Sequence, residues 1–224
     1  NTHVALAGYA DIFLGAAYCA ALMAFHNWFT TRQRWQGVLA LFFAISCVLI
    51  KDEGLAWSLT FVPAMAFILM PHRETARLGI LFALVLVLLW LLRPPGLEIA
   101  GYPLDYLDLS FHTEGLVGML QSIWLHDNWH LLGYLLLAII PLGLLMPGAM
   151  TRTYLPISVA LAAAATAFLF LFLFTGFGVA ASDFTGVGRL SIQLAPGLLY
   201  LSALLCNELF TTDGLQIKPL AQEP

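Results

Sequence analysis

The stretch LAAAATAFLFLFLF, residues 161–174, decides the class of fold. It contains one polar side chain, Thr166, and it lies inside a longer apolar run at 154–179. A helix that crosses the hydrocarbon core of a bilayer needs about 20 apolar residues. A transmembrane β-strand instead alternates apolar and polar residues over about ten positions. The stretch therefore predicts a membrane-spanning helix and argues against a barrel strand.

The composition of the whole chain agrees with this prediction. Of the 224 residues, 61% are hydrophobic and 10% are charged, whereas soluble domains are about 45–50% apolar and about 25% charged. The net charge of -4 offers no basic surface for nucleic acid. The three cysteines, Cys19, Cys47 and Cys206, lie far apart inside apolar runs, which indicates neither a disulfide framework nor a zinc site. We therefore predict an all-α polytopic membrane protein.

Seven apolar runs are candidate transmembrane helices: 4–25, 36–50, 55–70, 78–93, 130–147, 154–179 and 190–207. Between the fourth and fifth runs, residues 94–129 are rich in Pro and Gly and then become amphipathic, which predicts an extracytoplasmic loop that ends in an interfacial helix. Residues 1–207 are thus predicted to form one transmembrane domain, followed by a polar cytoplasmic tail at 208–224. The chain begins with Asn1 without a signal-peptide pattern, so a processed chain and a piece of a longer protein are both open alternatives.

The basic residues predict the orientation of the chain. If it starts outside and crosses seven times, most Lys and Arg residues fall on one side, which the positive-inside rule makes cytoplasmic. These residues are Arg32, Arg34, Arg73, Arg77, Arg152 and Lys218. Lys51, Arg93 and Arg189 fall on the outer side, together with most of the acidic residues.

Charged groups inside or at the edge of a span are candidate functional residues, because each costs roughly 2.5–3.5 kcal/mol at a helix centre. Asp11, in GYAD near the outer end of the first span, either faces a polar cavity or a cation, or is an acid favoured by the helix dipole. The segment Lys51-Asp52-Glu53-Gly54 offers an ammonium group suited to phosphate and two carboxylates. Its alternative is an ordinary charged loop between two spans.

Two further pairs have helical i, i+4 spacing. Arg189 and Gln193 share one face of the last span and could hold a phosphate, or Arg189 could extend to the membrane interface. His126 and His130 could bind a metal, but no third strong ligand is near them, which favours an interfacial loop.

Three of these motifs, in this order and spacing, resemble the C-terminal half of bacterial GT-C glycosyltransferases, a superfamily that includes the protein O-mannosyltransferases and the aminoarabinose transferases. The motifs are GYAD at 8–11, KDEGL at 51–55 and GRLSIQLAP at 188–196. The corresponding family patterns are roughly GYAD-L-P, TKNEG and DR-LLQL-P. This chain has Asp52 where the family usually has Asn, and Gly188 precedes Arg189, with the nearest Asp at Asp183.

The resemblance implies a transferase of the bacterial cytoplasmic (inner) membrane that takes sugar from a polyprenyl-phosphate donor at the extracytoplasmic face. A carboxylate would deprotonate the acceptor hydroxyl, and cations, with or without Mg²⁺ or Mn²⁺, would stabilise the leaving lipid phosphate. By motif match the site residues are Asp11 as a catalytic residue, Lys51, Arg189 and Gln193 as donor-phosphate ligands, and Tyr9, Asp52 and Glu53 as the cavity lining. Family members carry their base in the first extracytoplasmic loop, which would precede Asn1, so a missing N-terminal half or a protein partner would supply it.

Two other classes of protein stay open. A non-catalytic integral-membrane subunit of a larger complex would pair these charges with one another or with partner chains, and would have no lipid-filled groove. A small transporter or channel would need polar residues near the middle of the membrane. Residues 161–177 offer almost none beyond Thr166 and Thr175, so this class is the weakest of the three.

Overall fold

Helices make up almost all of the structure, a computed structural model that describes residues 2–92, 98–99, 102–103, 110–126, 130–145, 153–182 and 185–212. The elements in chain order are α1 (Thr2–Thr31), α2 (Arg34–Ile50), α3 (Glu53–Leu59), α4 (Phe61–Leu69), α5 (His72–Leu91), β1 (Glu98–Ile99), β2 (Tyr102–Pro103), α6 (Thr113–Gln121), the π-helix η2 (Ser122–His126), α7 (His130–Leu145), α8 (Leu155–Phe174), α9 (Gly178–Ser182) and α10 (Thr185–Thr212). The two short strands pair antiparallel.

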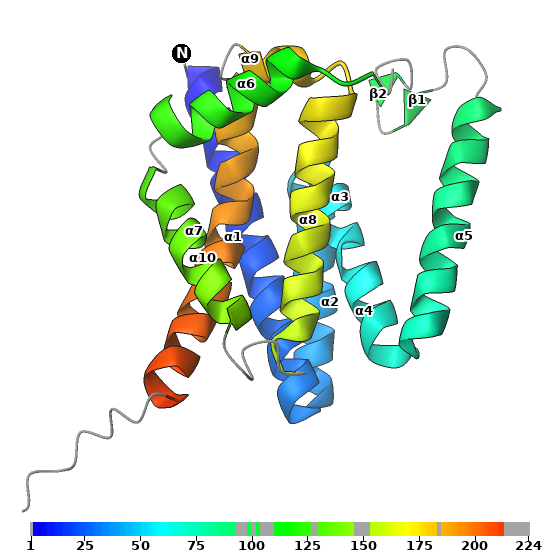
Figure 1. Cartoon of the computed structure of the whole chain (residues 1–224), viewed down its shortest axis with the longest axis vertical. Helices are drawn as coiled ribbons and strands as arrows, with labels where there is room; N and C mark the ends of the chain where they lie inside the picture. The colour runs from blue at the N-terminus through cyan, green and yellow to red at the C-terminus, as the bar shows by residue number, and fades with distance from the viewer. Residues whose placement is uncertain are drawn as a thin grey trace, which may run out of the picture.

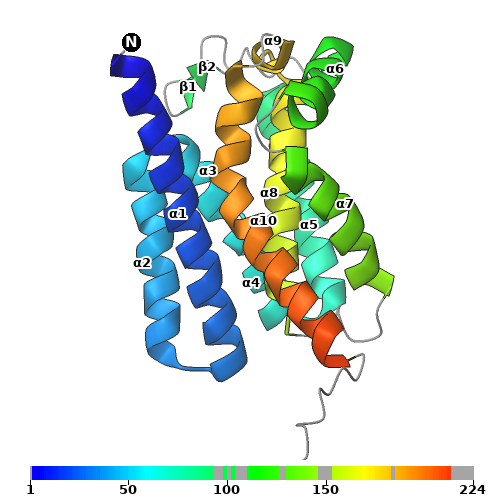
Figure 2. The ribbon, with the colours of Figure 1, turned by 90° about the vertical axis from the view of Figure 1, so that its left-hand side faces the viewer.

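The long helices form a bundle that is closed at one end by short elements. Helices α1, α2, α8 and α10 run along the long axis, and α7 packs against α10 (Figures 1 and 2). Helices α6 and α9 lie across the end where the chain begins (Figure 1). Helix α5 stands at the edge of the bundle beyond α4, and its apolar side chains, such as Phe82 and Leu84, are exposed. An apolar helix that is exposed in this way is stable in lipid and not in water.

The core lies where α1, α8 and α10 meet. Leu14 and Leu22 of α1 and Ile157 of α8 are fully buried in it. Tyr18 adds a polar contact, because its hydroxyl lies 2.8 Å from Oγ1 of Thr60, at the break between α3 and α4. Burial of side chains of this size contributes about 1.5–3 kcal/mol each relative to water, and in a bilayer close packing takes over that role.

A left-handed residue makes the turn between α1 and α2. Arg32 has φ of 58°, and its amide donates to the carbonyl of Trp28 at 2.9 Å. Non-glycine residues are uncommon in this region of φ, and Arg32 also lies over the ring of Phe29 at 4.8 Å. The turn brings α2 back alongside α1, which places Lys51 beside the first helix.

The predicted helical class is confirmed, but the structure does not support seven spans. Among the described residues, three helices are long and apolar enough to cross a membrane: Ala10–Thr31, Leu155–Phe174 and Gly186–Glu208. The predicted spans 36–50 and 130–147 form α2 and α7, of 17 and 16 residues, or about 25 Å at about 1.5 Å per residue, short of the ~30 Å core. The run 55–70 is divided at Thr60 into α3 and α4. The run 78–93 corresponds to part of α5, whose first turns carry charged residues.

Other predicted boundaries also differ from the structure. The run 154–179 ends as a helix at Phe174, and α9 then turns across the end of the bundle. The last helix begins at Thr185, earlier than predicted, and continues to Thr212 into the predicted tail, where Glu208 accepts a hydrogen bond from the Tyr154 hydroxyl at 2.9 Å. Within 94–129 the described parts are the paired strands β1 and β2 and residues 110–126, which include α6 and η2, and the remainder lies outside the described residues. An interfacial location for α6 stays a prediction.

Candidate functional site: a buried carboxylate and two cations

The carboxylate of Asp11 is the centre of a polar cluster inside the bundle. Asp11 is 1% exposed. Its Oδ1 accepts hydrogen bonds from Lys51 Nζ and Gln193 Nε2, both at 2.6 Å, and its Oδ2 accepts one from Arg189 Nε at 3.1 Å. These residues come from α1, the α2–α3 turn and α10, so the cluster joins three parts of the chain that are distant in sequence. A buried carboxylate needs such partners, because an unpaired charge in the interior is strongly destabilising.

Two glycines allow the backbones to come close enough for these contacts. A Cβ on Gly15 of α1 would lie 2.9 Å from the carbonyl oxygen of Ile192, so this glycine lets α1 approach α10. A Cβ on Gly54 would lie 1.9 Å from the carbonyl oxygen of Cys47. Gly54 therefore lets α3 fold back directly against the end of α2, which fixes the position of Lys51 between the two helices.

Trp57 completes the cluster and was not among the site residues predicted from the sequence. Its Nε1 donates to Gln193 Oε1 at 2.6 Å, and the indole is 2% exposed. This contact orients the amide of Gln193, so that its Nε2 points to Asp11. The signal in the sequence was the spacing of Gly54, Trp57 and Phe61, which indicates one buried helix face. This spacing predicts that Trp57 is buried, but it does not predict the hydrogen bond to Gln193.

The exposure of the charged side chains increases away from Asp11. The Lys51 side chain is 19% exposed and also contacts Glu53 at 3.1 Å, and the Arg189 side chain is 51% exposed. The positive charges of Lys51 and Arg189 balance the negative charges of Asp11 and Glu53. The contact with Asp11 uses only one of the N–H donors of Arg189, so its terminal nitrogens can bind a phosphate or carboxylate oxygen that arrives from outside.

Of the other predicted site residues, the structure describes the side chain of Asp52, which does not join these contacts. Asp52 is exposed and begins α3 without a side-chain cap. The side chain of Tyr9 lies outside the described residues, as do Asp183 and the side chains of His126 and His130.

The cluster does not fit a divalent metal. Both oxygens of Asp11 already face cations, and Mg²⁺ or Mn²⁺ would need oxygen ligands without competing positive charge. Across the described part of the chain, there is no group of three or more His, Cys, Asp or Glu side chains arranged to hold a metal ion. We therefore assign no step to a metal.

The fold and the cluster define a helical protein with three described helices long and apolar enough to cross a membrane, and with a charged site centred on a buried carboxylate. Comparisons of the chain with family models, with curated proteins and with solved structures gave no match.

Proposed function

We propose that this chain forms the donor-binding part of a membrane glycosyltransferase, and that its charged cluster binds the phosphate of a polyprenyl-phosphate-linked sugar. One observation carries the proposal: Arg189 is half exposed while a fully buried carboxylate holds its Nε. This arrangement presents a guanidinium group in a fixed position at the edge of a bundle whose long helices expose many large apolar side chains. A ligand with an anionic head and an apolar tail matches these two environments.

In the proposed reaction, the acceptor hydroxyl oxygen forms a bond to the anomeric carbon while the bond from that carbon to the lipid phosphate breaks. The electron pair leaves with the phosphate, and Arg189 and Lys51 stabilise the charge that develops there. The hydroxyl proton goes to a carboxylate base that a protein partner or a further segment would supply. Asp11 acts as a positioning residue, because its two oxygens already accept three hydrogen bonds and are buried.

The matched substitutions Arg189→Gln and Arg77→Gln test the phosphate site. Arg77 also pairs with a carboxylate, that of Glu74 at 2.6 Å, but on exposed α5. We expect Arg189→Gln to weaken polyprenyl phosphate binding at least ten-fold, because a charge-assisted hydrogen bond contributes about 1.5–3 kcal/mol. Arg77→Gln should leave binding unchanged. Native mass spectrometry of the full chain in detergent measures both affinities, with the uncharged polyprenol as the control ligand.

Equal binding by wild type and Arg189→Gln would contradict the proposal. It would favour the second candidate, a non-catalytic membrane subunit in which the cluster only holds helices together. The observation that favours a non-catalytic subunit is that Lys51 and Arg189 both form ion pairs with Asp11 of the same chain. Binding separates the two functions better than stability does, since the ion pair between Arg189 and Asp11 stabilises the fold under either function.

A further inference from the structure

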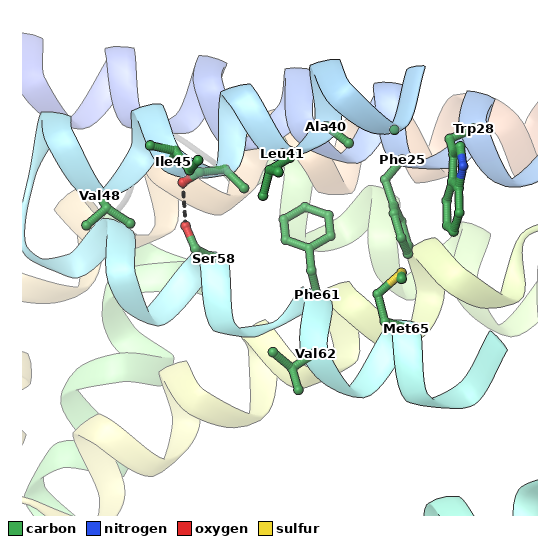
Figure 3. Close-up of a pocket in the computed structure, with 12 residues that line it drawn as sticks. Phe25, Trp28, Ala40, Leu41, Ile45, Val48, Ser58, Phe61, Val62 and Met65 are labelled. Carbon is green, nitrogen blue, oxygen red and sulfur yellow. Dashed lines mark hydrogen bonds between the residues drawn. The ribbon is translucent and has the colours of Figure 1, made fainter. Parts of the chain in front are cut away.

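An apolar groove runs along the outside of the bundle, between α2 and the α3–α4 segment. Its volume is about 550 Å³, within the range of about 300–1,000 Å³ found for ligand sites. Leu41 and Val48 form part of one wall, and Phe61 and Met65 form part of the other (Figure 3). Trp28 of α1 lies at the end of the groove away from Val48.

The groove ends toward the charged cluster beside Val48, where Gly54 of α3 packs directly against the backbone of Cys47 in α2. Inside the groove, the Ser58 hydroxyl donates to the carbonyl oxygen of Ala44 at 2.7 Å, which ties α3 to α2 (Figure 3). It also lies 2.8 Å from the carbonyl oxygen of Gly54 in its own helix. Ser58 thus has its hydrogen bonds within the protein, and the remaining side chains of the groove are almost entirely apolar. A ligand in this groove therefore has a hydrocarbon part along the walls and its polar group at the opposite end.

The opposite end carries positive charge. Gly37, Leu41 and Val48 lie on one face of α2, and the same spacing places Arg34 on that face, one turn beyond Gly37. Arg34 is exposed, as is Arg73 at the start of α5. An anionic headgroup at this end would be attracted by both residues.

Tryptophans mark this end as the level of the membrane interface. Trp28 lies in the last turns of α1 and Trp35 in the first turn of α2, where Trp35 Nε1 donates to Gln33 Oε1 at 2.9 Å. Tryptophan is enriched at the headgroup level of membranes. A lipid with its headgroup here would extend its acyl chain toward the middle of the bilayer, along the groove.

We propose that this groove binds one acyl chain of an anionic phospholipid, with its phosphate at Arg34. The charge of the Arg34 end, its tryptophans and the close packing of α3 on α2 at the other end together distinguish this occupant from a partner helix, which needs no anionic group. The site is separate from the cluster around Asp11, because Arg34 begins the 17-residue helix α2 and Lys51 follows its last residue. It therefore does not depend on the proposed transferase function.

Two pairs of variants of the full chain test this site in nanodiscs that contain phosphatidylglycerol and phosphatidylcholine. Leu41→Trp fills the groove, whereas Val38→Trp places the same ring on an exposed part of α2 outside it. Arg34→Gln removes the headgroup contact, and Arg77→Gln is its control on α5. The measurement is the amount of each lipid that stays bound to the protein, by native mass spectrometry after release from the nanodisc.

We expect wild type to retain phosphatidylglycerol in preference to phosphatidylcholine. Arg34→Gln should reduce this preference about five-fold, and Leu41→Trp should remove the retained lipid, whereas both controls should behave as wild type. Equal retention of the two lipids by wild type would overturn the proposal. So would lipid retention that Leu41→Trp leaves unchanged, or a Leu41→Trp variant that converts a dimer into a monomer, which would assign the groove to a second copy of the chain.

Discussion

Replacement of Gly54 by alanine is expected to destabilise the protein strongly. The added Cβ would lie 1.9 Å from the carbonyl oxygen of Cys47, and that atom belongs to the backbone of α2, so it cannot rotate away. The α2–α3 turn would have to open, and Lys51 would move from Asp11. Overpacking of this kind typically costs about 1–3 kcal/mol, and a clash with backbone belongs at or above the upper end of that range. The midpoint of thermal unfolding in detergent measures the effect.

Gly188→Ala is the matched control for this prediction. Gly188 also lies in a helix, but a Cβ there would have no neighbour within 4 Å. Because alanine favours a helix over glycine by about 1 kcal/mol, Gly188→Ala should be neutral or slightly stabilising. If the two variants unfold at the same temperature, the close packing of α3 against α2 does not hold the cluster in place.

Replacement of Asp11 by alanine is the second substitution with a large expected effect. It removes the only described carboxylate that contacts both Lys51 and Arg189, and it leaves Gln193 Nε2 without its acceptor in the interior. Loss of one partner of a buried ion pair costs about 3–5 kcal/mol. We expect Asp11→Ala to lower the free energy of unfolding by an amount near or below the lower end of this range, because Lys51 and Arg189 both reach solvent. Asp11→Asn should also destabilise, since an amide offers one acceptor oxygen where the carboxylate offers two.

Glu74→Ala provides the control for Asp11→Ala. Glu74 forms an ion pair of the same 2.6 Å length with Arg77, but on the surface of α5, where both side chains are more than half exposed. Its loss should change stability by about 0–1 kcal/mol. Denaturation of the variants in matched detergent compares them. Similar small effects for both substitutions would contradict the view that Asp11 holds α1, α2 and α10 together.

The class of fold could be predicted from the sequence, whereas the number of spans could not. The run 161–174 forms the C-terminal part of α8, because in lipid a single segment satisfies its own backbone groups only as a helix. The break at Thr60 depends on contacts with distant residues, since Thr60 bonds to Tyr18 of α1. A hydropathy pattern contains no such contact, so it joins α3 and α4 into one run.

The residues of the cluster could be selected from the sequence, but their pairing could not. Asp11, Lys51 and Arg189 are candidate functional residues because charges are rare in apolar helices. Their convergence on one carboxylate depends on Gly15 and Gly54, whose role is visible only from the backbone atoms that face them. The sequence also suggested that Asp11 is a catalytic residue, and the three hydrogen bonds to its oxygens favour a positioning role instead.

The most direct test of the central claim is to locate the phosphate end of a bound lipid. A polyprenyl phosphate with a photoreactive diazirine on the isoprene unit next to the phosphate is cross-linked to the full chain, and the labelled peptides are identified by mass spectrometry. We expect label in the α2–α3 turn around Lys51 and in the first turns of α10 around Arg189, competed by unlabelled polyprenyl phosphate and not by polyprenol. Label confined to the Arg34 end, or scattered over the lipid-facing helices, would contradict a phosphate site at the cluster.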